Sequence, residues 1–141
     1  MKYVGKCLCE TVQFEIIGEF ENFFLCHCER CRKDTGSAHA ANLFSNTATL
    51  RWIVGEENIQ TFNYQSDGHI KSFCKTCGSA LPNIQFDGTL LVVPAGSLDT
   101  QVHIRPQGHI FLAHKANWDK ELNTVPGYAY FPTTDRNQKE D

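Results

Sequence analysis

Three closely spaced cysteines, Cys26, Cys28 and Cys31, are the feature that most constrains this sequence. One residue separates the first two, and two residues separate the second pair. Three thiols this close cannot all pair as disulfides, but they can converge on one soft, tetrahedral cation. Zn²⁺ bound by thiolates at about 2.3 Å is the usual case. Three ligands from one segment leave the fourth position open or supplied from elsewhere, which is the arrangement of a catalytic zinc.

The other four cysteines form two chelating pairs, Cys7 with Cys9 and Cys74 with Cys77. Pairs this far apart in sequence suit one closed four-thiolate site that joins the N-terminal segment to the middle of the chain. The seven cysteines therefore divide into four and three, which predicts two zinc ions per chain. A disulfide framework is less favoured because the cysteine count is odd and no secretory signal is expected. A redox pair at Cys74 and Cys77 is less favoured because no βαβ pattern surrounds it.

The length and charge of the chain indicate one domain that binds neither nucleic acid nor membrane. The 141 residues carry a formal net charge of −3, which provides no basic surface for nucleic acid. The first residues start no apolar run, so no signal peptide is expected, and the most apolar stretch, residues 90–95, is too short to span a bilayer. A reducing cytoplasm is the natural compartment for seven metal-bound or free thiols. We expect a domain over residues 1–132 and a polar, disordered tail over residues 133–141.

Alternating apolar residues and regularly spaced turn signals predict a mainly β domain of packed antiparallel sheets with short helical turns. In residues 11–17, the side chains of Val12, Phe14 and Ile16 fall on one face of a half-buried strand. Polar residues from Glu29 to about Thr35 predict one or two helical turns that end at Gly36. Further strands are expected over residues 23–25, 38–44, 49–54, 59–64, 69–73, 81–86 and 90–95, with hairpins across Ser66-Asp67-Gly68 and Asp87-Gly88.

The last part of the chain lacks this regular pattern. Proline, glycine and aromatic residues are concentrated in residues 125–132. We expect these aromatic side chains to lie over a sheet as an irregular cover. Trp118 and Phe111 are expected in the core or in the wall of a pocket.

The cysteine motifs have distinctive neighbours. They read Gly-x-Cys-x-Cys from Gly5, Cys-His-Cys-x-x-Cys-Arg-Lys from Cys26 and Phe-Cys-x-x-Cys-Gly-Ser from Phe73, and the pattern continues in Gly36-Ser37, Gly96-Ser97-Leu98-Asp99, Pro106, His109-Ile110-Phe111 and Trp118. Over residues 3–119 the chain thus resembles the glutathione-dependent formaldehyde-activating enzyme family, which includes centromere protein V. The resemblance implies a single zinc-bearing, mainly β domain, with a structural zinc held by the four-cysteine set and a catalytic zinc held by the three-cysteine set. It also implies a carbon–sulfur lyase type of activity, in which glutathione and formaldehyde give S-(hydroxymethyl)glutathione.

The charge of the three-cysteine site points to the same chemistry independently. Zinc held by three thiolates carries one net negative charge, so it acidifies water poorly and matches a fourth, exogenous thiol better. Such a thiol would be held as a thiolate near pH 7, below the free-thiol pKa of about 8.5. The bound sulfur, or one that dissociates from zinc, could attack the carbon of a small aldehyde. The product would be a hemithioacetal.

Side chains close to the three-cysteine motif are candidates for supporting roles. Arg32 and Lys33 could bind the carboxylate of a thiol substrate or stabilise a developing alkoxide, although a solvated basic pair is the alternative. His27 lies between two ligands and points away from the metal, so a structural or surface role is expected. Ser37 and His39 could donate a proton to the product oxygen, although plain hydrogen bonding is the simpler role.

Two other interpretations of the three-cysteine site stay open. In the first, His39 or His109 closes a Cys₃His site in a non-catalytic, zinc-stabilised binding module. In the second, an open zinc serves a related carbon–sulfur lyase or thiol-adduct enzyme with a different substrate. Uptake of an added thiol tests the first, and substrate profiling tests the second. His109 is otherwise a candidate lid or pocket residue, with a hydrogen-bonded core histidine as the alternative.

Overall fold

The computed structural model describes residues 1–65 and 68–132, and this part of the chain is mainly β, as the sequence predicts. The strands are β1 (Lys2–Lys6), β2 (Gln13–Ile17), β3 (Asn22–Cys26), β4 (Ala40–Ser45), β5 (Thr49–Val54), β6 (Ile59–Tyr64), β7 (His69–Cys74), β8 (Ala80–Leu81), β9 (Asn83–Gln85), β10 (Leu90–Pro94) and β11 (Gly108–Ile110). The helices are α1 (Glu29–Thr35) and the short 3₁₀ helices Glu56–Asn58, Ala95–Ser97, Leu112–His114 and Leu122–Thr124. None of these described helices is long and apolar enough to cross a membrane.

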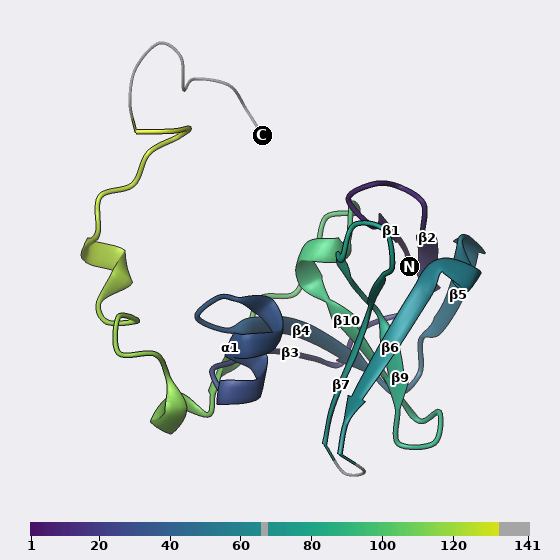
Figure 1. Cartoon of the computed structure of the whole chain (residues 1–141), viewed down its shortest axis with the longest axis horizontal. Coiled ribbons are helices and arrows are strands. Elements are labelled where there is room, and N and C mark those ends of the chain that lie inside the picture. The colour runs from purple at the N-terminus through teal and green to yellow at the C-terminus, as the bar shows by residue number, and fades with distance from the viewer. Residues whose placement is uncertain (66–67, 133–141) are drawn as a thin grey trace.

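The strands form three sheets (Figure 1). The first has the order β1-β2-β5, the second β11-β3-β4-β10-β9, and the third β6-β7-β8. Neighbouring strands are antiparallel except β11, which runs parallel to β3. The predicted packed antiparallel sheets are therefore confirmed, with β11 as the exception.

Among the described residues, the larger of two hydrophobic clusters lies between the sheets. The alternation in residues 11–17 correctly predicts that Val12, Phe14 and Ile16 share a buried face, because none of them is more than 1% exposed. Their side chains belong to the same cluster as Leu43 of β4 and Val93 of β10, both in the second sheet. The first two sheets thus bury their apolar faces against each other, which is the main source of stability in a domain of this kind.

Helix α1 has the bounds that the sequence predicts. Its first turn is capped by Cys28, whose sulfur accepts a hydrogen bond from the backbone N–H of Cys31 at 3.3 Å. The helix ends at Gly36, which adopts the left-handed conformation at φ 67° and donates its N–H to the carbonyl of Arg32 at 2.8 Å. A residue with a Cβ would be strained at this position. The cysteine cap therefore fixes the start of the helix and the position of two thiols together.

The strand predicted over residues 81–86 is two strands instead. β8 pairs with β7 in the third sheet, whereas β9 pairs with β10 in the second. Pro82 separates them, because proline has no N–H to donate to a ladder. The predicted hairpin across Asp87-Gly88 does join β9 to β10. Of the other predicted turn, Ser66 and Asp67 lie outside the described residues, but β6 and β7 on either side of it do pair.

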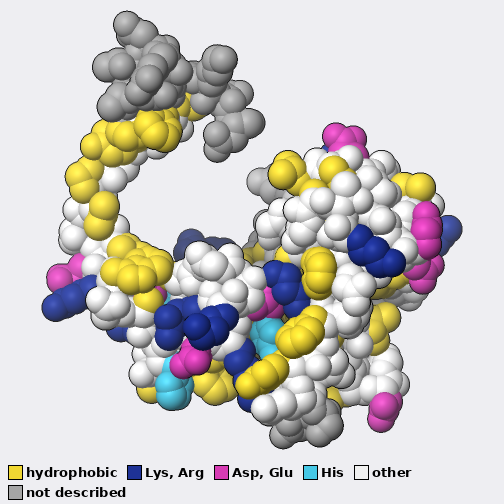
Figure 2. Space-filling view, viewed as in Figure 1, with side chains coloured by type: hydrophobic (Ala, Val, Ile, Leu, Met, Phe, Trp, Pro, Cys, Tyr) yellow, Lys and Arg dark blue, Asp and Glu magenta, His cyan; other side chains and the backbone are white. Residues whose placement is uncertain are grey.

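The C-terminal segment differs from the prediction. Residues 120–132 run away from the sheets as an extended arm instead of covering one of them (Figure 1). Apolar side chains are exposed along this arm (Figure 2). Phe111 and Trp118 are 58% and 57% exposed, so neither is a core residue. The core forms between the sheets without the arm, and apolar side chains such as Ile53, Phe62 and Ile84 stay exposed on the strands. The predicted tail, residues 133–141, lies outside the described residues.

Candidate metal centres

The four cysteines that are far apart in sequence meet in one cluster. Cys7 and Cys9 follow β1, Cys74 ends β7, and Cys77 comes shortly after it. Their sulfur atoms all lie within 4.8 Å of one another, with 3.6 Å between Cys7 and Cys9 and 3.8 Å between Cys9 and Cys74. Gly78, at φ 77°, turns the chain sharply after Cys77 and donates its N–H to the Cys74 carbonyl at 2.8 Å. This four-cysteine cluster could hold one metal ion.

Hydrogen-bond donors around the four-cysteine cluster favour the thiolate form of two of its members. The Ser79 hydroxyl, followed by the backbone N–H groups of Cys9 and Ser79, lowers the pKa of Cys77 to about 5. The backbone N–H of Cys77 is the main cause of the lowered pKa of Cys74. Burial instead raises the pKa of Cys7 to about 11. The lowered pKa of Cys77 favours its thiolate, which is the form that binds a soft cation.

Cys26, Cys28 and Cys31 converge where β3 leads into α1. Their sulfur atoms also lie within 4.8 Å of one another, and no other described Cys, His, Asp or Glu joins this three-cysteine cluster. Burial raises the pKa of Cys26 and of Cys31. Burial also opposes ionisation of Cys28, but the backbone N–H groups of Cys31 and Arg30 are among the hydrogen bonds that outweigh it and lower the Cys28 pKa. The cluster could hold a metal ion through three sulfurs.

A cavity of about 320 Å³, here called the cysteine cavity, opens beside the three-cysteine cluster. Cys26 and Cys31 line it, together with the polar side chains of Asn42, His69 and Asn83 from three different strands. Its volume lies in the range of ligand pockets, about 300–1,000 Å³. The cavity is therefore large enough to hold a small molecule beside Cys26 and Cys31.

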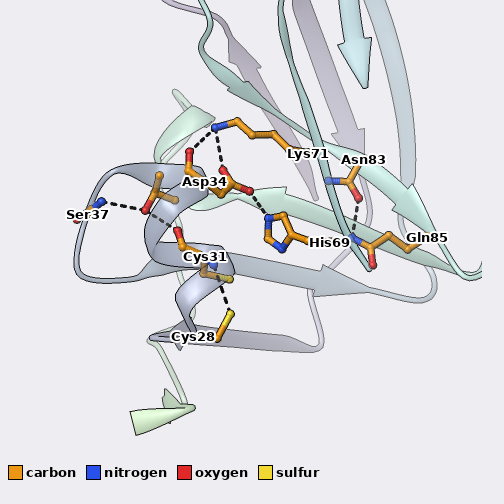
Figure 3. A network of polar contacts seen from close by, with 9 residues as sticks. Cys28, Cys31, Asp34, Ser37, His69, Lys71, Asn83 and Gln85 are labelled. Carbon is orange, nitrogen blue, oxygen red and sulfur yellow. Dashed lines mark hydrogen bonds and ion pairs between the residues drawn. The ribbon is translucent and has the colours of Figure 1, made fainter. Parts of the chain in front are cut away.

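Asp34, His69 and Lys71 form a bonded group on the wall of the cysteine cavity, here called the wall triad (Figure 3). His69 Nε2 contacts Asp34 Oδ2. Lys71 Nζ lies 2.8 Å from Asp34 Oδ1 and 2.6 Å from the Asp34 carbonyl oxygen. This group was not predicted from the sequence. Its only signals are that strand alternation puts His69 and Lys71 on one face, and that Asp34 follows Cys31 by about one helical turn.

A second space of about 680 Å³, here called the outer cavity, shares the wall triad with the cysteine cavity. Arg30 and Lys33 of α1 and Phe62 and Tyr64 of β6 line it. The Arg30 guanidinium lies 4.9 Å from the centre of the Tyr64 ring, which is a cation–π arrangement. Of the two basic residues that the sequence suggested for a supporting role, Lys33 lines the outer cavity and Arg32 lines neither cavity.

His27, His39 and His109 lie together, outside the three-cysteine cluster. His27 is only 2% exposed, with its Nδ1 3.0 Å from Asp119 Oδ2 and its Nε2 2.8 Å from His109 Nδ1. Burial lowers the pKa of His27, against the effect of Asp119. The His39 ring lies 5.1 Å from that of His27, centre to centre. Neither His39 nor His109 belongs to the three-cysteine cluster, and neither His39 nor Ser37 lines the cysteine cavity.

The fold and these sites define a small, mainly β domain with two cysteine clusters that could hold metal ions. The sequence model of the glutathione-dependent formaldehyde-activating enzyme family matches residues 2–114, so the chain belongs to this family. A crystal structure of a Rhodobacter sphaeroides protein is similar, with a TM-score of 0.53 and 24% sequence identity, and the match covers 77% of this chain and 99% of that one. This likeness shows a shared fold. The family match ends at residue 114, before the exposed arm begins.

Proposed function

We propose that the protein is an enzyme that adds a thiol, such as glutathione, to a small aldehyde, such as formaldehyde. The product would be S-(hydroxymethyl)glutathione, and the reverse reaction is that of a carbon–sulfur lyase. Membership of the family supports the reaction class. One observation carries the proposal: Cys26 and Cys31 of the three-cysteine cluster line a cavity, and the described residues supply no fourth ligand to that cluster.

The donor atoms of both clusters suit zinc, because all of them are soft sulfur ligands within reach of one centre. Four sulfurs fill a tetrahedral site, which is the pattern of a structural zinc, whereas three leave one position for a substrate. The Ser79 hydroxyl and the backbone N–H groups that lower the pKa of Cys77, and the hydrogen bonds that lower the pKa of Cys28, support this assignment, since zinc binds thiolates. We therefore propose two zinc ions per chain, a structural one held by Cys7, Cys9, Cys74 and Cys77 and a catalytic one held by Cys26, Cys28 and Cys31.

The cysteine cavity would bring the two reactants together. Zinc bound by three thiolates would provide a soft position that keeps a substrate thiol as a thiolate near pH 7. Gln85 donates a hydrogen bond to Asn83 Oδ1 at 2.8 Å, which leaves the Asn83 amide N–H groups free to donate (Figure 3). Asn83 and Asn42 line the cavity, so their amides could polarise the aldehyde oxygen and stabilise negative charge that develops on it.

The outer cavity would recognise the rest of the thiol substrate. Glutathione carries two carboxylates, and Arg30 and Lys33 present positive charge on the helix side of this cavity. Phe62 and Tyr64 offer apolar surface on the opposite strand. The unpaired state of all seven cysteines supports a cytoplasmic location, where a reduced thiol pool is present.

The test is the rate of exchange between formaldehyde and its glutathione adduct. These components interconvert without a catalyst, so ¹³C exchange spectroscopy with labelled formaldehyde at equilibrium is a suitable measurement. The zinc-loaded protein should accelerate exchange, and Cys28→Ser should not. If the fully zinc-loaded protein leaves the exchange rate at its uncatalysed value, the proposed reaction is wrong. If the protein accelerates exchange only with another thiol or aldehyde, that compound is its substrate.

A further inference from the structure

We propose that His69 is the proton-transfer residue of this site, accepting the proton of the substrate thiol and returning it to the oxygen of the aldehyde adduct. This inference rests on the proposed function and adds a residue to it. His69 lines the cysteine cavity with Cys26 and Cys31, although it lies on β7, far from the cysteine motif in sequence. Histidine is the side chain that exchanges protons most readily near neutral pH.

The wall triad fixes both the tautomer and the orientation of His69. An ionised carboxylate only accepts hydrogen bonds, so the contact of Asp34 Oδ2 with His69 Nε2 places the ring proton on Nε2. The lone pair on Nδ1 is then free to accept a proton. Figure 3 shows this second ring nitrogen directed away from Asp34. Lys71 holds the carboxylate through contacts at 2.8 Å to Oδ1 and 2.6 Å to the backbone oxygen. Asp34 and Lys71 are therefore positioning residues.

The other ionisable groups near His69 are less suited to this role. Besides its cysteines, the described lining of the cysteine cavity contains only Asp34, His69 and Lys71 as titratable residues, and Lys71 is engaged with Asp34. The helix α1 contributes Glu29, Arg30 and Lys33, and β6 contributes Tyr64, to the outer cavity only. His69 is the group on the shared wall whose free nitrogen can serve the reacting atoms.

The proposed cycle conserves protons and electrons. The S–H bond of the thiol breaks, and its proton passes to His69 Nδ1. The sulfur electron pair forms the S–C bond to the aldehyde carbon, and the pair of the C=O π bond moves to oxygen. His69 Nδ1–H then donates its proton to that oxygen, which gives the neutral hemithioacetal. The imidazole is regenerated, and no oxidant, reductant or further reactant is consumed.

The test compares His69→Asn with His103→Gln, a change at an exposed histidine outside both cavities. His69→Asn should retain both zinc ions and bind glutathione, but its kcat should fall about 10²–10⁴-fold, the usual contribution of a general acid or base. His103→Gln should behave as wild type. Wild-type rates in His69→Asn would overturn the inference and leave the proposed function standing. Loss of one zinc ion in His69→Asn would also overturn it, because His69 would then be a ligand.

A second readout does not depend on turnover. Calorimetry of glutathione binding in buffers of different ionisation enthalpy counts the protons released to solvent. The wild-type protein should keep the thiol proton on His69, whereas His69→Asn should release about one more proton per glutathione bound. Asp34→Asn should give an intermediate kcat and a shifted pH profile, because it misorients the imidazole without removing it. Equal proton release by wild type and His69→Asn would contradict the proposal, even if the wild-type enzyme is active.

Discussion

Cys9 and Cys74 are 65 residues apart in sequence, and their sulfur atoms lie 3.8 Å apart. This contact joins the segment after β1 in the first sheet to the end of β7 in the third. A metal ion bound there closes a long loop, whereas the three-cysteine cluster comes from one short segment and closes none. Loss of a cysteine ligand should therefore have different effects on the protein at the two proposed sites.

Loss of a four-cysteine ligand should unfold the domain. Closed thiolate sites in small zinc domains have apparent binding free energies of about 10–16 kcal/mol. Net stabilities of domains are only about 5–15 kcal/mol. We expect Cys77→Ser to be insoluble or to lack a cooperative thermal transition by circular dichroism. A soluble Cys77→Ser protein with a wild-type transition would show that this cluster is not needed for the fold.

Loss of a three-cysteine ligand should abolish function and leave the fold. Cys28→Ser removes the thiol with the lowered pKa at the start of α1. Serine can still cap the helix, so the helix itself should form. We expect one zinc ion per chain by elemental analysis, a circular dichroism spectrum like that of the wild type, and no thiol binding. If Cys28→Ser unfolds as completely as Cys77→Ser, the cluster is structural and the catalytic assignment is wrong.

Acid should release the two metal ions in two steps, with the three-cysteine site emptied at the higher pH. Protons compete with the metal for thiolates, so a ligand with a raised pKa loses its metal sooner as the pH falls. Burial raises the pKa of two of the three ligands, Cys26 and Cys31, but of one of the four, Cys7. In the four-cysteine cluster, hydrogen-bond donors lower the pKa of Cys74 and bring that of Cys77 to about 5, whereas in the three-cysteine cluster only Cys28 has a lowered pKa. Zinc retained after dialysis at stepwise lower pH measures this in wild type and in Cys28→Ser, which should show only the second step. Cys28→Ser retains only the ion of the four-cysteine cluster. If the wild-type protein loses that ion at a higher pH than the other one, the predicted order is wrong.

Charge in the outer cavity should determine which thiols bind well. Arg30→Gln and Lys33→Gln should each raise the KM for glutathione about fivefold, since an exposed ion pair contributes up to about 1 kcal/mol. Neither change should affect the KM for 2-mercaptoethanol, which has no carboxylate. The exposed Arg105, which lines neither cavity, provides the matched control Arg105→Gln. Equal effects on both thiols would show that this cavity does not recognise the carboxylates.

Local spacing in the sequence was enough to predict the cysteine clusters and the elements next to them. The three-cysteine cluster comes from one short segment, residues 26–31. Helix α1 ends at Gly36, whose φ of 67° suits few other residues. The four-cysteine cluster joins two pairs whose internal spacing already favours one centre. The buried face of β2 follows from alternation alone, because one face of the strand is apolar.

The wall triad and the C-terminal arm depend on tertiary contacts that spacing does not encode. In the sequence, His69 is one residue of a predicted strand with no sign of a partner. It joins the wall triad only because β7 lies beside α1, the helix that carries Asp34. Lys71 joins the same carboxylate through the same register. The aromatics of residues 125–132 predicted a cover over a sheet, but the pattern does not specify which face they would contact, and the core forms without them. Pro82 was visible in the sequence, yet only the pairing shows that it divides one strand between two sheets.

X-ray absorption at the zinc edge, with and without glutathione, tests the central claim most directly. Clusters of four and three cysteines predict an average of about 3.5 sulfur ligands per zinc, rising to about 4 when a thiol fills the open position. S-methylglutathione has the same carboxylates but no thiol, and it should leave the average unchanged. An average that rises with glutathione alone is the result that we predict. An average that stays at its starting value at saturating glutathione would contradict the claim that the three-cysteine centre takes up a substrate thiol.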